Sequence, residues 1–126
     1  MQKVKSIFEN FSEKFPILNK TYDLYQEAAD ISKSEENTLR KSSEITILEI
    51  LELIVIATRQ SKEDKKQTLR QALRKLDTLK VFANMAKELK AVSEAKYNTF
   101  IESSESVSKM VGGWLKAINA TTSTSK

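Results

Sequence analysis

Residues 45–57 read ITILEILELIVIA, and this stretch decides the fold. Its many β-branched residues, taken alone, are typical of a strand. The stretch lies, however, in a segment from Ser34 to Gln60 without glycine or proline, and a run of that length is ordinary for a helix and very unusual for a strand. We therefore predict a helix over this segment, started by Ser34 and the two carboxylates that follow it.

Apolar residues cover most of the circumference of this helix, so we expect it to be buried on several sides, one of them by another subunit. Glu49 and Glu52 lie three residues apart within it. Paired carboxylates on bundle helices can hold iron, but the known motif is Glu-x-x-His, and this chain has no histidine. We interpret the two glutamates as facing a groove or a basic residue of a neighbouring subunit.

The chain before this helix has two parts. Apolar residues from Ile17 to Ser32 continue a helical pattern, which predicts a separate helix. Pro16 breaks the pattern, and residues 1–15 in front of it form a short amphipathic lead-in. The apolar positions of the lead-in, spaced mainly by three and four, are Val4, Ile7, Phe8, Phe11 and Phe15.

Two further helices are expected after residue 60. Ser61 and Asp64 form a capping pattern that opens a helix to about Val92, and Ser93 opens the last helix. Residues 121–126 are small and polar, which predicts a flexible tail. The sequence therefore predicts an all-α, antiparallel four-helix bundle with a short extra N-terminal amphipathic helix, in one domain of residues 1–120.

Composition narrows the classes of function. The 126 residues include no cysteine and no histidine, which removes thiolate chemistry, the commonest general acid/base and the commonest metal ligand. No catalytic triad, phosphate loop or zinc motif is recognisable, so we predict no enzyme, no cofactor and no metal site.

Residues 45–57 are shorter than the roughly 18 uncharged residues that a membrane span needs, and residues 1–15 lack the apolar run of a signal peptide. We therefore expect a cytoplasmic protein without a membrane partner.

Positive charge is concentrated in one segment. Residues 59–90 hold ten Lys/Arg against four Asp/Glu, although the net charge of the whole chain is only +4. A spacing of four predicts a cationic stripe along the third helix of the bundle, which can follow nucleic-acid phosphates, although a solvated helix face is the plainer interpretation of the stripe alone. The candidate nucleic-acid-binding residues are Lys62, Lys66, Arg70 and Arg74, extended by Lys80 and Lys87.

Both glycines of the chain stand side by side in the last helix, within the segment MVGGWLK at residues 110–116. Each glycine costs on the order of 1 kcal/mol relative to alanine in a helix, so a compensating role is expected. One interpretation is the close approach of another backbone, with Trp114 filling the adjacent space. The other is an interface with another chain, made by Gly112, Gly113, Trp114 and Lys116.

This segment and three earlier ones resemble a known family. Residues 76–82 (LDTLKVF), residues 85–89 (MAKEL), Tyr97 and residues 110–116 are together similar to the accessory variability determinant (Avd) proteins of diversity-generating retroelements. The resemblance covers roughly residues 22–116. The chain departs from the family at Ser108-Lys109, where Gly-Arg is usual, and in the position of its Lys-Phe-Pro sequence, which lies at residues 14–16.

The resemblance implies a four-helix bundle that assembles into a homopentameric barrel with a basic surface. It also implies binding of a retroelement reverse transcriptase and of template RNA or other nucleic acid, without catalysis by the protein itself. A related branch comprises small helical proteins encoded in intervening sequences of ribosomal RNA genes. The alternative is an oligomeric helical scaffold that binds a protein partner and has no nucleic-acid role.

Overall fold

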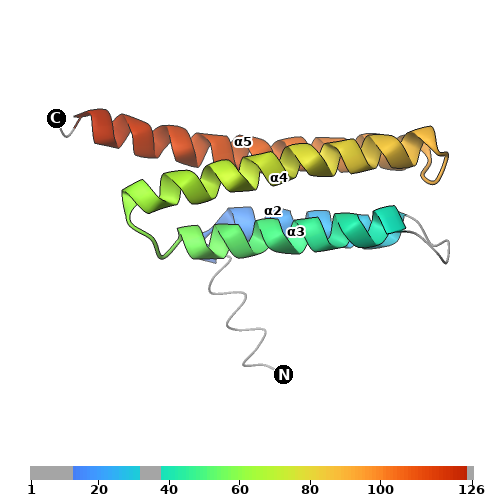
Figure 1. Ribbon diagram of the computed structural model, residues 1–126, viewed down its shortest axis with the longest axis horizontal. Helices are drawn as coiled ribbons and strands as arrows, with labels where there is room; N and C mark the ends of the chain where they lie inside the picture. Colours follow the sequence, from blue (N-terminus) through green and yellow to red (C-terminus); the bar gives the residue numbers. More distant parts are fainter. Residues whose placement is uncertain (1–12, 32–37, 125–126) are drawn as a thin grey trace, which may run out of the picture.

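Four α-helices make up almost all of residues 13–31 and 38–124, which are the residues that this computed structural model describes. They are α2 (Pro16–Ile31), α3 (Thr38–Ala57), α4 (Lys62–Glu88) and α5 (Glu94–Thr124), and no strand occurs in these ranges. Figure 1 shows α4 and α5 lying above α2 and α3. The predicted all-α four-helix bundle is confirmed, whereas most of the lead-in and the start signal at Ser34 lie outside the described residues.

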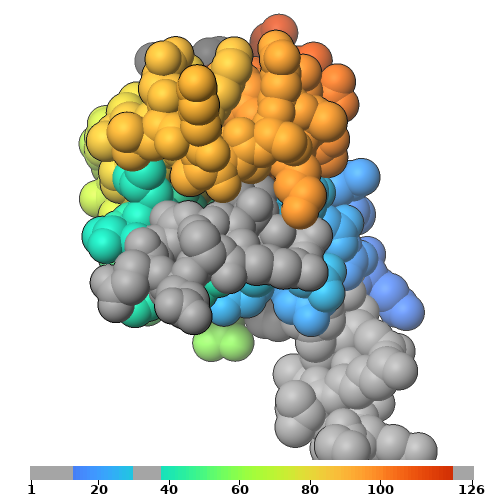
Figure 2. Space-filling model, turned by 90° about the vertical axis from the view of Figure 1, so that its right-hand side faces the viewer, coloured from blue at the N-terminus to red at the C-terminus, as the bar shows by residue number. Residues whose placement is uncertain are grey.

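Side-chain contacts show that successive helices run in opposite directions. Glu49 on α3 pairs with Lys75 on α4, with 3.1 Å between Oε1 and Nζ. Lys80 on α4 pairs with Glu105 on α5 at 2.6 Å, and Lys87, farther along α4, lies over the ring of Tyr97, nearer the start of α5. Figure 2 looks along the bundle and shows α3 (teal) and α2 (blue) on opposite sides of its lower half.

The helix starts after residue 60 agree with the capping patterns in the sequence. The Ser61 hydroxyl accepts a hydrogen bond from the backbone N–H of Asp64 at 3.3 Å, and the Ser93 hydroxyl accepts one from Lys96 at 3.2 Å. Each bond satisfies a backbone donor that has no partner within the first turn of its helix.

The helix ends differ from expectation. α3 stops at Ala57 rather than near Gln60, and α4 stops at Glu88 rather than near Val92. Lys90 adopts a φ of 58°, and the N–H of Ala91 then donates to the carbonyl of Ala86 at 2.9 Å, as in a helix-ending turn that usually uses glycine. Because a lysine occupies that position, the sequence carried no stop signal. At the other end of the chain, α5 continues to Thr124, through part of the predicted flexible tail.

Each helix contributes one buried apolar stripe to a common core. Thr21 is the buried polar exception on α2, and its hydroxyl donates to the carbonyl of Ile17 at 2.8 Å. The largest fully buried side chain is that of Phe100 on α5. The core also contains residues that are each less than 2% exposed: Leu24, Ile47, Ile50, Ile54, Leu69, Leu76, Leu79, Val107 and Val111.

Replacing Phe100 by alanine should lower the free energy of unfolding by about 3–5 kcal/mol, because a large ring is lost from a closely packed core. Urea denaturation followed by circular dichroism measures the loss. Thr99→Ala is the matched control, since Thr99 is the exposed neighbour on the same helix. Equal losses for the two variants would show that Phe100 is not a core residue.

Candidate functional site

The six cations predicted to bind nucleic acid do not form one straight stripe. A spacing of four residues shifts each position by about 40° around a helix, so the row winds around α4. Lys62 and Arg74 are exposed, while Arg70, Lys80 and Lys87 are half-buried. The side chain of Lys66 is only 14% exposed. The row therefore lies partly on the outer surface of the bundle and partly at the boundary between α4 and the other helices.

Three of the six cations contact groups of their own chain. Lys66 Nζ lies 3.0 Å from a carboxylate oxygen of Glu63, and Lys80 pairs with Glu105 on α5. Lys87 Nζ lies 4.7 Å from the centre of the Tyr97 ring. No ion pair with a described residue is found for the remaining three, which are Lys62, Arg70 and Arg74.

The Lys80 ammonium lowers the pKa of Glu105 below its ordinary value, through the hydrogen bond first and then through its charge, and Lys109 adds to the effect. The ionised carboxylate is thus the form that the fold favours. This pair stabilises the contact between α4 and α5 above the ordinary carboxyl pKa, and the contribution is lost as the pH falls through the lowered pKa. Lys80 therefore serves the bundle, and its charge is already matched.

One cation outside the predicted row, Lys75, lines an open groove on α4. Gln71, Arg74, Lys75 and Thr78 line this groove, which has a volume of about 440 Å³. All four lie within eight residues on one side of α4, so a spacing of three and four was the available signal. Lys75 was missed because it lies outside the steps of four that begin at Lys62.

Lys75 also corrects the interpretation of the paired glutamates. Glu49 binds this lysine of its own chain, rather than a basic residue of a neighbouring subunit, and Glu52 is exposed on α3. Among residues 13–31 and 38–124, no group of three or more acidic side chains is placed to hold a metal ion. Glu49 and Glu52 thus have separate surroundings.

The two glycines of α5 do not serve a close approach within this chain. A Cβ atom added to Gly112 or Gly113 would meet no described neighbour within 4 Å. Trp114 points elsewhere, because its ring stacks on Phe15 at 6.2 Å and Lys65 Nζ lies 5.4 Å from the ring centre. The interpretation that glycines and tryptophan share one packing contact is therefore wrong for the single chain. Lys116 is exposed, on the last part of the segment.

Apart from Tyr22 on α2, the large apolar side chains that remain exposed among the described residues belong to α3 and α4. On α3, where we expected burial on several sides, Ile45, Leu48 and Ile56 are 57%, 47% and 41% exposed. On α4 the uncovered residues are spaced by four: Val81 at 57%, Met85 at 44% and Leu89, just past the helix end, at 69%. The sequence pattern did not reveal the α4 strip, because the leucines and alanines of the core dominate the pattern of that helix.

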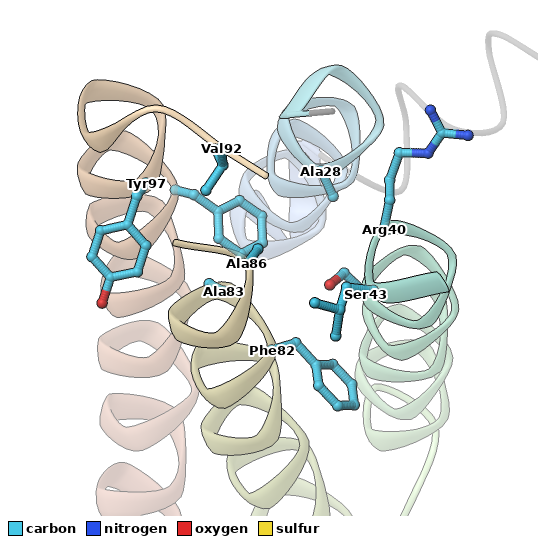
Figure 3. Close-up of a pocket in the computed structure, with 10 residues that line it drawn as sticks. Ala28, Arg40, Ser43, Phe82, Ala83, Ala86, Val92 and Tyr97 are labelled. Carbon is cyan, nitrogen blue, oxygen red and sulfur yellow. The ribbon is translucent and has the colours of Figure 1, made fainter. Parts of the chain in front are cut away.

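A small, partly enclosed cavity lies between the described helices, close to where α4 gives way to α5 (Figure 3). Its volume of about 20 Å³ has room for about one water molecule, far below the roughly 300 Å³ of a small-molecule site. It therefore offers no room for a substrate. The lining residues are Ala28, Leu39, Arg40, Ser43, Phe82, Ala83, Ala86, Val92, Tyr97 and Phe100.

Comparison of the chain with protein-family models, curated proteins and solved structures found no match. Within the described ranges, no helix has the length and apolar character needed to cross a membrane. A function is therefore inferred from the exposed surfaces of α3, α4 and α5.

Replacing Gly112 or Gly113 by alanine should raise the free energy of unfolding by about 1 kcal/mol each, since the added methyl group meets no described neighbour and alanine favours the helix. Ala117→Gly, at an exposed position farther along the same helix, is the reverse control and should lower it by a similar amount. Urea denaturation gives both values. Destabilisation by alanine at both glycines would mean that the fold itself requires them.

Proposed function

We propose that this protein is a cytoplasmic, non-enzymatic accessory protein of a diversity-generating retroelement. In this proposal it assembles as a homo-oligomer, a pentamer by the family resemblance, and holds a reverse transcriptase and RNA. The observation that carries the proposal is the uncovered apolar surface of α3 and α4, because exposed patches of this kind mark sites of protein association. The resemblance at residues 76–89 and 110–116 supports the identity of the partners.

Self-association is supported by the position of the uncovered residues. Val81, Met85 and Leu89 follow one another at single turns along the outside of α4. On α3, Ile45 and Ile56 lie within about 20° of each other around the helix, on the side that Glu49 and its partner on α4 occupy. Packing against a second copy removes both strips from water, and the apolar area buried would stabilise the assembly.

Nucleic-acid binding is supported by the three cations without an ion pair among the described residues, Lys62, Arg70 and Arg74. The groove that Arg74 lines also presents the side-chain amide of Gln71 as a donor for phosphate oxygens. Aromatic residues are not interleaved with these cations along α4. Recognition through charge and shape, rather than through base stacking, is therefore the expected mode.

The second candidate is an oligomeric scaffold that binds a protein partner without nucleic acid. It is favoured by the contacts of Lys66, Lys80 and Lys87 within the chain, which halve the number of predicted cations available to phosphates. A reverse transcriptase gene beside this one, with a nearly matched pair of repeats, would support the first candidate. Its absence would support the scaffold.

Replacing Lys62, Arg70 and Arg74 together by glutamine should weaken binding to a structured RNA, and should reduce the slope of log affinity against log salt by roughly 3 if each cation meets one phosphate. Fluorescence anisotropy at several salt concentrations measures the slope. The control replaces Lys20, Lys41 and Lys96, all exposed on other helices, by glutamine and changes the net charge equally. Equal slopes for the two triple variants would exclude α4 as the contact surface, and absence of binding by the native protein would favour the scaffold.

Sedimentation equilibrium of the native protein should give a mass of several 14.3-kDa chains. Met85→Lys combined with Leu89→Lys should reduce that mass to one chain, because two cations cannot be buried in an apolar contact without partners. Both side chains are exposed in the single chain, so the helix content should remain. Asn19→Lys with Asn98→Lys adds the same charge at exposed positions of α2 and α5 and should leave the mass unchanged. A native protein that sediments as one chain would contradict self-association.

A further inference from the structure

The outward side of α3 carries a row of two apolar residues and one carboxylate. α3 and α4 lie side by side on one face of the bundle, in front of α2 and α5 in Figure 1. Ile45, Leu48 and Glu52 are all exposed and lie within about 60° of one another around α3. Glu52 has no ion pair with a described residue. This row therefore combines an uncovered apolar part with a free negative charge.

The outward side of α4 carries a row of the same kind with the opposite charge. It consists of Arg70, Arg74, Val81 and Met85, which lie within about 60° of one another around the helix. Arg70 is half-buried and the other three are exposed, and neither arginine has an ion pair with a described residue. The row is thus cationic in its first half and apolar in its second half.

The ion pair between Glu49 and Lys75 gives the relative height of the two rows, because α3 and α4 run in opposite directions. Glu52 comes three residues after Glu49 on α3. The same height on α4 lies three residues before Lys75, midway between Arg70 and Arg74. Each arginine is about 3 Å away along the helix axis. The carboxylate of α3 is therefore level with the arginines of α4.

The apolar parts of the two rows are level as well. Ile45 comes four residues before Glu49, and the same height on α4 lies four residues after Lys75. That height is about 3 Å along the axis from Val81. The two rows therefore match each other in height, in charge and in apolar character.

We propose that α3 of one copy lies antiparallel on α4 of a second copy at the same height, a contact that rests on the self-association proposed above. Copies related by rotation about an axis parallel to the bundle keep each residue at its own height. Glu52 then meets the arginines of the second copy, and Ile45 meets its Val81. One carboxylate pairs with one of the two arginines, so positive charge remains at this edge for nucleic acid.

Contact between like helices matches the rows less well. α4 on α4 alone would leave Ile45 and Leu48 in water, and α3 on α3 alone would leave the strip of α4 exposed. A two-fold contact that includes both like pairs has one crossing height for both. If that height lies between Ile45 and Leu48, Val81 of one copy faces Arg74 of the other. Only α3 on α4 covers both apolar strips and pairs the charges beside them.

Charge reversal on the two helices tests the contact by sedimentation equilibrium. Glu52→Arg by itself, and Arg70→Glu with Arg74→Glu in another chain, each place like charges opposite one another. Each variant should weaken the native association on the order of tenfold. Mixed in equal amounts, the two variants should regain the native mass, because opposite charges then meet in every contact between unlike chains.

The controls reverse the same charges elsewhere on the surface. Glu102→Arg on α5, and Lys20→Glu with Lys96→Glu on α2 and α5, lie at exposed positions and should keep the native mass. A native mass in Glu52→Arg, or no recovery on mixing, would overturn this contact and leave self-association in place. A native protein that sediments as one chain would overturn both. Retained helix content by circular dichroism establishes that the variants are folded.

Disulfide formation between copies provides a second measurement, because the native chain contains no cysteine. Ile45→Cys chains mixed with Val81→Cys chains should form a linked dimer under mild oxidation, since a disulfide requires Cα atoms within roughly 7 Å. Ile45→Cys mixed with Ala95→Cys, exposed on α5, is the control and should not. Absence of the mixed dimer would overturn the proposal. A linked dimer of Val81→Cys chains alone would also overturn it, by assigning the contact to α4 on α4.

Discussion

Burial of one apolar stripe from each of four helices is the interaction on which the rest of this structure depends. The chain has no cysteine, so no disulfide contributes to its stability. Residues such as Leu24, Ile50, Leu76 and Val107 come from four different helices and are all fully buried in one core. Because this core holds the helices together, parts of the outward surfaces of α3, α4 and α5 can carry features that the core does not need.

α4 shows most clearly that core packing and an exposed surface share one helix. Its inner side carries the leucines and alanines of the core, and its boundary with α5 carries lysines whose charge is matched by Glu105 or lies over Tyr97. Only the outward part combines cations without an ion pair among the described residues with the apolar strip Val81, Met85 and Leu89. Counting charges along the helix overstates the surface that a polyanion can use, because part of the charge joins α4 to its neighbours.

The glycine pair of α5, in contrast to these lysines, is not needed for the packing of the described helices. Two adjacent glycines lower the stability of a helix, and the described part of the bundle offers no atom close enough to require them. The adjacent Trp114, in contrast, is engaged by Phe15 and Lys65. The packing of the described helices therefore does not explain the glycine pair on α5.

The sequence by itself determined the helical class, the four helices and the caps at Ser61 and Ser93, because these depend on periodicity and on hydrogen bonds between residues three or four apart. The sequence did not predict where α4 ends, since Lys90, just past the helix, adopts a backbone conformation that usually marks glycine. Only the tertiary structure decided which cations are matched, that Glu49 binds Lys75, and that the glycines have open space beside them. Each of these depends on groups that are distant in sequence and are brought together, or kept apart, by the packing of the core.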